Sequence, residues 1–189
     1  MIVTAHQPNF FPFYPIFQKM DESDVFVIIE NCQFEKNNYQ NRFHIGDVWY
    51  TMSVNKGLDP IHTKKYVFHE KDWNRIKSSL PKYKKVLSLF DDCLSDNLSE
   101  MNSNIIRKSA SILGIDTKIV VDYPTDLVGT DRLVDICLRN NATTYLSGIS
   151  GSKYLELDKF KEHNIDVIFQ NESNMIKRPL VDMLLEKIN

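Results

Sequence analysis

Short apolar runs alternate with stretches of helical periodicity at both ends of the chain. Residues 2–5 and 24–30 are nearly continuous apolar runs, a pattern typical of parallel strands that are covered on both faces. Residues 14–20, between them, place apolar side chains at helical spacing, so this part of the chain predicts a strand-helix-strand unit. Further strands are predicted at residues 118–122, 143–147 and 165–169. The pattern therefore predicts an α/β fold with three layers and a mainly parallel sheet.

The middle of the chain breaks this alternation. Gly46-Asp47 separates two extended runs, which predicts an antiparallel hairpin that departs from the main sheet. Residues 73–113 then carry apolar side chains at helical spacing, and Pro81 favours two or three helices over a single one. Gly114 is expected to cap the last of these helices.

Helices are also expected between the later strands and at the carboxyl terminus. Gly129-Thr130-Asp131 predicts the start of one helix, and residues 152–163 and 180–188 predict two more. In this interpretation Thr130 is most simply a helix N-cap. Arg132, one turn into the helix, forms either a surface ion pair or a contact with substrate.

Composition limits the classes of protein that fit. The chain has 189 residues, of which 42% are hydrophobic, enough for one domain spanning residues 1–189. Its 23 Lys and Arg residues against 25 Asp and Glu give a net charge of −2, which argues against a nucleic-acid or anionic-membrane partner. There is no membrane-length apolar segment, and the three scattered cysteines fit reduced thiols, so we expect a cytoplasmic protein.

The first predicted strand runs directly into His6-Gln7-Pro8-Asn9. Ligands of open α/β sheets bind where strands end, so this turn is a candidate active-site loop. His6 is either an acid-base catalytic group or a histidine that caps the strand. Asn9 is a second catalytic candidate or a simple turn former.

Two further segments carry polar groups suited to a ligand. Residues 36–42 form either a solvated loop or a binding loop in which Lys36 and Arg42 would contact phosphate. The turn from Ser147 to Gly151 can direct backbone N–H groups toward a phosphate or carboxylate. Tyr154 either stacks on a ligand or packs in the core. No H-E-x-x-H, C-x-x-C, Walker or Gly-x-Ser-x-Gly pattern occurs, so no metal site is expected.

These residues resemble those of the WbqC-like proteins. Members of this family are found in bacterial gene clusters for the biosynthesis of O-antigen and related lipopolysaccharide. The resemblance covers nearly the whole chain. It depends on His6-Gln7-Pro8-Asn9, Ser23–Val27, Gln33-Phe34, Lys36, Gln40-Asn41-Arg42, Thr130, Arg132, Tyr145–Gly148, Tyr154-Leu155 and Phe169-Gln170. Phe13 departs from the pattern, because the family often has tryptophan there, and Asn37 stands where a second basic residue is common.

The resemblance implies transfer of an acyl group, such as glycyl, to the amine of a nucleotide-linked amino sugar. The partners would be that nucleotide-sugar and an amino acid or other acyl donor, activated by ATP with magnesium or delivered by another carrier; an oligomer stays open. His6 and Asn9 would be catalytic. The implied substrate-binding residues are Gln7, Lys36, Gln40, Asn41, Arg42, Thr130, Arg132, Ser147, Gly148, Gly151, Tyr154 and Gln170.

A looser similarity links the amino-terminal strand-turn-helix to the nucleotidylyltransferase and pantothenate synthetase group. That group places two histidines over ATP phosphates, but Phe-Phe-Pro stands where the second would be expected. Two alternatives to acyl transfer therefore stay open: a non-catalytic nucleotide-sugar binding or scaffold subunit, and a nucleotidyltransferase that acts on a sugar phosphate.

Overall fold

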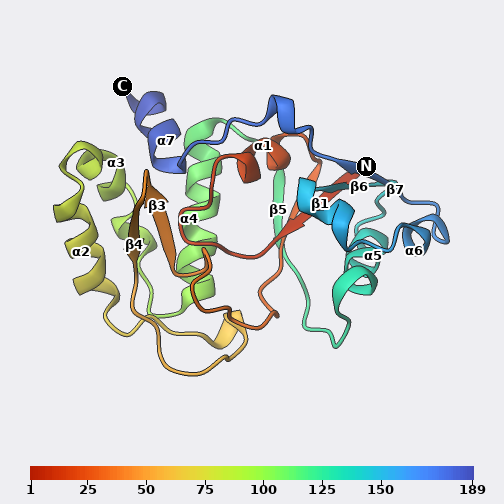
Figure 1. Cartoon of the computed structure of the whole chain (residues 1–189), viewed down its shortest axis with the longest axis horizontal. Helices are drawn as coiled ribbons and strands as arrows, with labels where there is room; N and C mark the ends of the chain where they lie inside the picture. Colours follow the sequence, from red (N-terminus) through yellow and green to blue (C-terminus); the bar gives the residue numbers. More distant parts are fainter. The chain divides into compact units, whose positions relative to one another are not determined.

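The computed structural model describes residues 1–189, which divide into two compact units (Figure 1). The sheet unit comprises residues 1–6, 15–29 and 115–176. The helical unit comprises residues 7–14, 30–114 and 177–189. Each unit is therefore assembled from separate stretches of sequence, and the expectation of a single domain stays a prediction.

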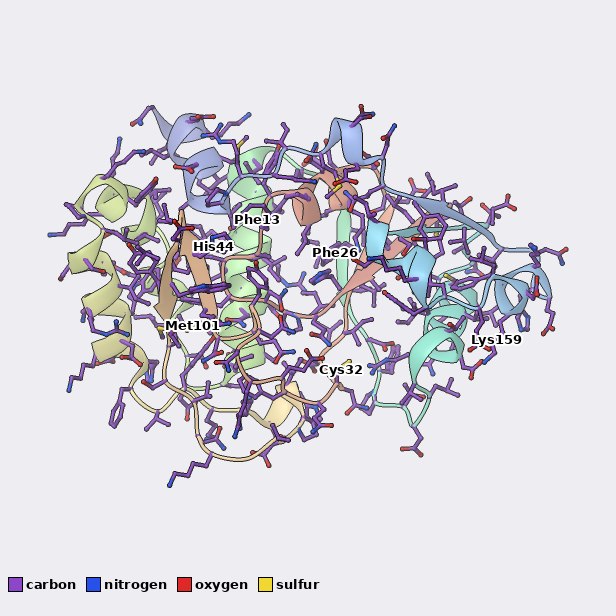
Figure 2. The ribbon with its side chains drawn as sticks, viewed as in Figure 1. Phe13, Phe26, Cys32, His44, Met101 and Lys159 are labelled. Carbon is purple, nitrogen blue, oxygen red and sulfur yellow. The ribbon has the colours of Figure 1, made fainter.

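The sheet unit contains the parallel sheet that the apolar runs predict. Its strands are β1 (Ile2–His6), β2 (Val25–Ile28), β5 (Lys118–Val121), β6 (Thr144–Ser147) and β7 (Asp166–Phe169). They lie in the order β5-β2-β1-β6-β7, and every neighbouring pair is parallel. β2 is buried along its whole length, as expected for a strand covered on both faces, and Phe26 lies in its core (Figure 2).

Three helices connect these strands. They are α1 (Pro15–Asp21), α5 (Gly129–Arg139) and α6 (Leu157–Lys161). α1 leads from β1 to β2 on one side, whereas α5 and α6 lead in the opposite direction across the sheet. Right-handed crossovers then place α1 on one face and α5 with α6 on the other, and α5 contacts α6 (Figure 1). The three-layer α/β prediction is confirmed.

Two local expectations for this unit are wrong. The predicted helix over 152–163 is instead a 3-10 turn, Ile149–Lys153, followed by the short helix α6. The turn is tight because Gly151 packs directly on Ser147, where a β-carbon would lie 2.0 Å from the serine Oγ. Thr130 is not the N-cap of α5, since Val128 holds that position without a side-chain cap.

The helical unit contains the predicted hairpin and the long helices. The hairpin, β3 (Arg42–Ile45) with β4 (Val48–Thr51), forms a two-stranded sheet of its own rather than a branch of the main sheet. The helices are α2 (His69–Ser79), α3 (Lys84–Ser88), α4 (Leu98–Leu113) and α7 (Leu180–Ile188). α4 is capped by Gly114, whose φ of 79° gives the left-handed cap that the sequence predicts.

Aromatic side chains of the Phe10-Phe11 segment anchor the core of the helical unit. Phe11 stacks on Trp73 with ring centroids 5.7 Å apart and meets Phe90 edge-on at 5.1 Å. Met101 of α4 is fully buried in the same unit (Figure 2). Phe11 has a φ of 45°, a conformation that costs a bulky residue about 1–3 kcal/mol. The aromatic packing therefore holds the segment after His6-Gln7-Pro8-Asn9 in a conformation that its local sequence disfavours.

None of the helices combines the length and apolar character that a bilayer-spanning segment needs.

Candidate functional site

The parallel sheet opens between β1 and β6. Chain connections leave this pair of strands in opposite directions, which makes it the switch point where α/β sheets bind ligands. The ladder between them ends early, because only Ile2↔Thr144 and Val3↔Tyr145 pair. β1 and β2, by contrast, stay paired as far as His6↔Ile28. Beyond Val3 the two strands are joined by a side chain, as the Thr4 hydroxyl donates to the Leu146 carbonyl at 2.7 Å.

A cleft of about 340 Å³, the switch-point cleft, lies at this opening. It is lined by the carboxyl ends of β1, β6 and β7 and by α1 and the 3-10 turn. The polar side chains in its wall belong to His6, Lys19, Tyr145, Ser147, Ser150, Tyr154 and Gln170, and no carboxylate is among them. The structure therefore brings together His6, Ser147, Gly148, Tyr154 and Gln170 of the predicted site.

The wall formed by the 3-10 turn is held by short contacts within the sheet unit. Ser147 is buried, and its hydroxyl donates to the Gly148 carbonyl at 3.0 Å. Gly151 packs behind Ser147, so it shapes the turn rather than lining the cleft. Gln170 donates from Nε2 to the Pro15 carbonyl at 2.9 Å and fixes the opposite wall to the start of α1. Tyr154 is 65% exposed, so its ring is open to a ligand.

Lys19 is the cleft residue that sequence reasoning missed. It lies on α1 with only 4% of its surface exposed, and its ammonium donates to the Ala5 carbonyl at 3.0 Å. Burial lowers the pKa of Lys19 to about 8. A lysine in a helix is usually solvent-exposed; the available signal was its place between Phe17 and Met20 on the apolar face of α1.

Thr130 and Arg132 do not line the switch-point cleft. Both are buried, and Arg132 pairs with Asp122 through Nε and Nη2, each 2.8 Å from Oδ2. Thr130 accepts a hydrogen bond from the Glu156 amide at 3.2 Å. Of the two interpretations offered for Arg132, the ion pair is the one observed, but it is buried rather than on the surface.

In the helical unit, a buried polar network fixes the loop that follows His6. Gln40 has no exposed surface; its Nε2 donates to Gln7 Oε1 at 2.8 Å and its Oε1 accepts from the Glu35 amide. Asn102 of α4 donates to the carbonyls of Pro8 and Gln40, both at 2.7 Å. These bonds saturate the Asn102 amide group and hold two predicted site segments together within this unit. Nothing in the spacing of Asn102 along an amphipathic helix distinguishes it from a surface residue.

Asn9 and Asn41 are also buried in the helical unit. Asn41 donates to the Met52 carbonyl at 2.7 Å, which ties the loop to the end of the hairpin. The Oδ1 atom of Asn9 is buried and accepts no hydrogen bond. Such an orphaned acceptor is costly, and a ligand that donates to it would recover that cost.

Lys36 and Arg42 share a hollow of about 230 Å³ in the helical unit. The Arg42 guanidinium lies 4.0 Å above the Trp49 ring and donates to the Asn37 carbonyl. No carboxylate pairs with it, and Lys36 is exposed. An aromatic row continues beside it: Trp49 packs on His44, which stacks on Phe13 at 5.5 Å (Figure 2). These charges and rings suit the phosphate and the planar faces of a nucleotide.

Two of the three cysteines, Cys93 and Cys137, are buried. Burial raises the pKa of Cys93 to about 11 and that of Cys137 to about 12, which leaves both thiols protonated at neutral pH. No group of three or more His, Cys, Asp or Glu side chains is placed to hold a metal ion.

The sequence was compared with protein families, curated proteins and solved structures. The model of the WbqC-like protein family matches residues 7–178. The chain belongs to the WbqC-like protein family. A protein of Mycobacterium tuberculosis (strain ATCC 25618 / H37Rv), named "Uncharacterized protein Rv1507c", is 26% identical over 184 residues, covering 87% of this chain and 80% of its own length. No solved structure matches at a significant level, so the resemblance to the nucleotidylyltransferase group is without structural support.

Proposed function

We propose that this WbqC-like protein transfers an acyl group, such as glycyl, to the amine of a nucleotide-linked amino sugar in the cytoplasm, during surface polysaccharide biosynthesis. The observation that carries the proposal is the switch-point cleft, where His6, Lys19 and neutral polar side chains surround a space free of carboxylates. A negatively charged nucleotide-sugar meets no like charge in its wall. The cleft also lies where ligands of open α/β sheets are expected.

In the proposed reaction, the amine nitrogen of the sugar attacks the acyl carbon. The new bond is an amide C–N bond, and the bond between the acyl carbon and its leaving group breaks. That leaving group is the phosphate oxygen of AMP when ATP activates the acyl group, or the carrier atom when another donor supplies it. His6 removes the proton that the attacking amine loses, which is the usual role of an imidazole beside a nucleophile.

The remaining cleft residues would position substrates. Gln170 and Ser147 supply polar atoms beside His6, and the exposed Tyr154 ring offers a flat face to a sugar or base. The helical unit carries candidate binding groups of its own: Lys36 and Arg42 would bind a phosphate, and the orphaned Asn9 oxygen would accept a hydrogen bond from a ligand. Gln7, Gln40 and Asn41 would act through the network that holds their loop.

The test is a mass measurement on the sugar. Purified protein is incubated with ATP, magnesium, a panel of amino acids and a thymidine-diphosphate amino sugar. We expect a mass gain that requires both ATP and one amino acid. The gain should disappear in His6→Gln and persist in His163→Gln, a matched change at an exposed histidine.

Other outcomes would replace the proposal. Pyrophosphate release from a nucleoside triphosphate and a sugar phosphate, with no amino acid required, would indicate a nucleotidyltransferase. Nucleotide-sugar binding without mass gain from any donor would indicate a binding or scaffold subunit. Unchanged turnover in His6→Gln would remove His6 from the chemistry.

A further inference from the structure

The Lys19 ammonium lies beyond the point where the hydrogen-bond ladder between β1 and β6 ends. The carbonyls of Ile2 and His6 accept bonds on the β2 side, so the alternation along β1 turns the Ala5 carbonyl toward β6. β6 does not reach it, because the ladder between these strands ends at Val3↔Tyr145. The Lys19 ammonium donates to the Ala5 carbonyl instead, at 3.0 Å. Lys19 of α1 thus places a positive charge at the point where β1 and β6 separate.

The charge of Lys19 has no internal counterion. No carboxylate lies within ion-pair distance of its ammonium, and none of the residues that line the cleft is acidic. Its only hydrogen-bond partner is the backbone carbonyl of Ala5. A buried cation with so little compensation is expensive, and proteins tolerate such groups mainly where they are used.

We propose that the Lys19 ammonium binds the anionic group of the substrate in the switch-point cleft, as the one side chain of lysine or arginine in its wall. This deepens the proposed function, on which it rests for the identity of the anion. That anion is either the diphosphate of the nucleotide-linked sugar or the carboxylate of the amino acid. Lysine can bind either as a point charge.

Anion binding at Lys19 should be linked to proton uptake. Burial holds the pKa of the free lysine at about 8, so at pH 8.5 a large share of the protein carries a neutral amine. An anion beside the amine favours the ammonium form and raises this pKa again. The protein must then take up a proton as the anion binds.

Isothermal titration calorimetry at pH 8.5 tests this in two buffers, Tris and EPPS, which differ in heat of ionisation. The probes are thymidine diphosphate and N-acetylglycine, both fully ionised at that pH. We expect one probe to bind with proton uptake, which names the phosphate or the carboxylate as the source of the anion. Lys19→Met should lower the affinity for that probe by at least about 10-fold and abolish the proton uptake.

Two further variants keep the test interpretable. Lys19→Gln retains a donor for the Ala5 carbonyl, so it should bind as weakly as Lys19→Met if charge is what matters. Lys161→Met changes an exposed lysine of α6 and should bind like wild type.

The proposal is overturned if neither probe binds, or if Lys19→Met binds both probes as tightly as the wild-type protein does. Because binding needs no turnover, the two proposals fail separately. If binding depends on Lys19 but no acyl transfer is found, only the proposed function is contradicted. If acyl transfer is found but Lys19→Met binds both probes like wild type, only the role of Lys19 in anion binding is contradicted.

Discussion

Two buried cations of the sheet unit have opposite surroundings. Arg132 of α5 directs two nitrogen atoms at one carboxylate oxygen of Asp122, and both side chains are almost fully buried. Lys19 of α1 is equally buried but meets only a backbone carbonyl. A third buried cation, Lys64 of the helical unit, resembles Arg132 in having a carboxylate partner, because Asp59 lies 3.5 Å from its ammonium.

The comparison separates a structural charge from one available for binding. Arg132 and Asp122 neutralise each other, so their pair can tie α5 to the end of β5 without any ligand. Lys19 keeps its charge unneutralised at a cleft that a ligand can enter. The sequence positions of Lys19 and Arg132 look alike, one lysine and one arginine on amphipathic helices, and only their surroundings distinguish them.

The largest expected effect comes from breaking the paired side of this comparison. Asp122→Ala leaves Arg132 buried without its counterion, and we expect the free energy of unfolding to fall by about 3–5 kcal/mol. Urea denaturation measures it. Asp158→Ala is the control, because it breaks an exposed pair with Lys161 and should cost under about 1 kcal/mol. Equal losses in the two variants would contradict the structural role given to the Arg132 pair.

The next effect comes from reshaping the cleft without changing its charge. A β-carbon at Gly151 would collide with Ser147, so Gly151→Ala should lower the free energy of unfolding by about 1–3 kcal/mol and displace the 3-10 turn. Adding Ser147→Gly removes the colliding atoms and should restore part of the loss, which a double-mutant cycle would measure. Additive losses would show that the two residues do not meet.

The smallest effect has the opposite sign. Lys19→Met removes an uncompensated buried charge, so at pH 7 we expect the free energy of unfolding to rise, by at most about 3 kcal/mol. The pKa of Lys19 is about 8 in the folded protein, below its value of 10.5 in the unfolded chain. The cost of its charge is therefore complete below pH 8 and disappears as the pH rises through 10.5.

Urea denaturation at pH 7 and pH 10 measures this dependence. The difference between Lys19→Met and wild type should shrink at the higher pH. A difference that stays constant between the two pH values would mean that burial does not perturb Lys19.

Sequence patterns predicted the sheet better than the site. Continuous apolar runs such as residues 24–30 identify buried parallel strands because few other structures bury every side chain. His6 could be placed at the carboxyl end of a strand for the same reason, since the end of β1 was visible in the sequence. The 3-10 turn was missed because helical spacing over 152–163 does not show that Gly151 must pack on Ser147.

Residues that act through long-range contacts were outside the reach of local patterns. Lys19 looks like an ordinary helix lysine, and its burial depends on where β1 and β6 separate. Asn102 reaches the carbonyls of Pro8 and Gln40, which lie 94 and 62 residues away in the sequence. Arg132 was identified as a candidate for ion pairing, but the identity of its partner, Asp122, required the fold.

A crystal structure of the protein with a thymidine-diphosphate amino sugar and glycine would test the central claim most directly. We expect the sugar nucleotide in the switch-point cleft with its amine near His6, and an anionic oxygen of the diphosphate or of the glycine carboxylate about 3 Å from the Lys19 ammonium. Density for the ligand elsewhere, with this cleft empty, would contradict the account.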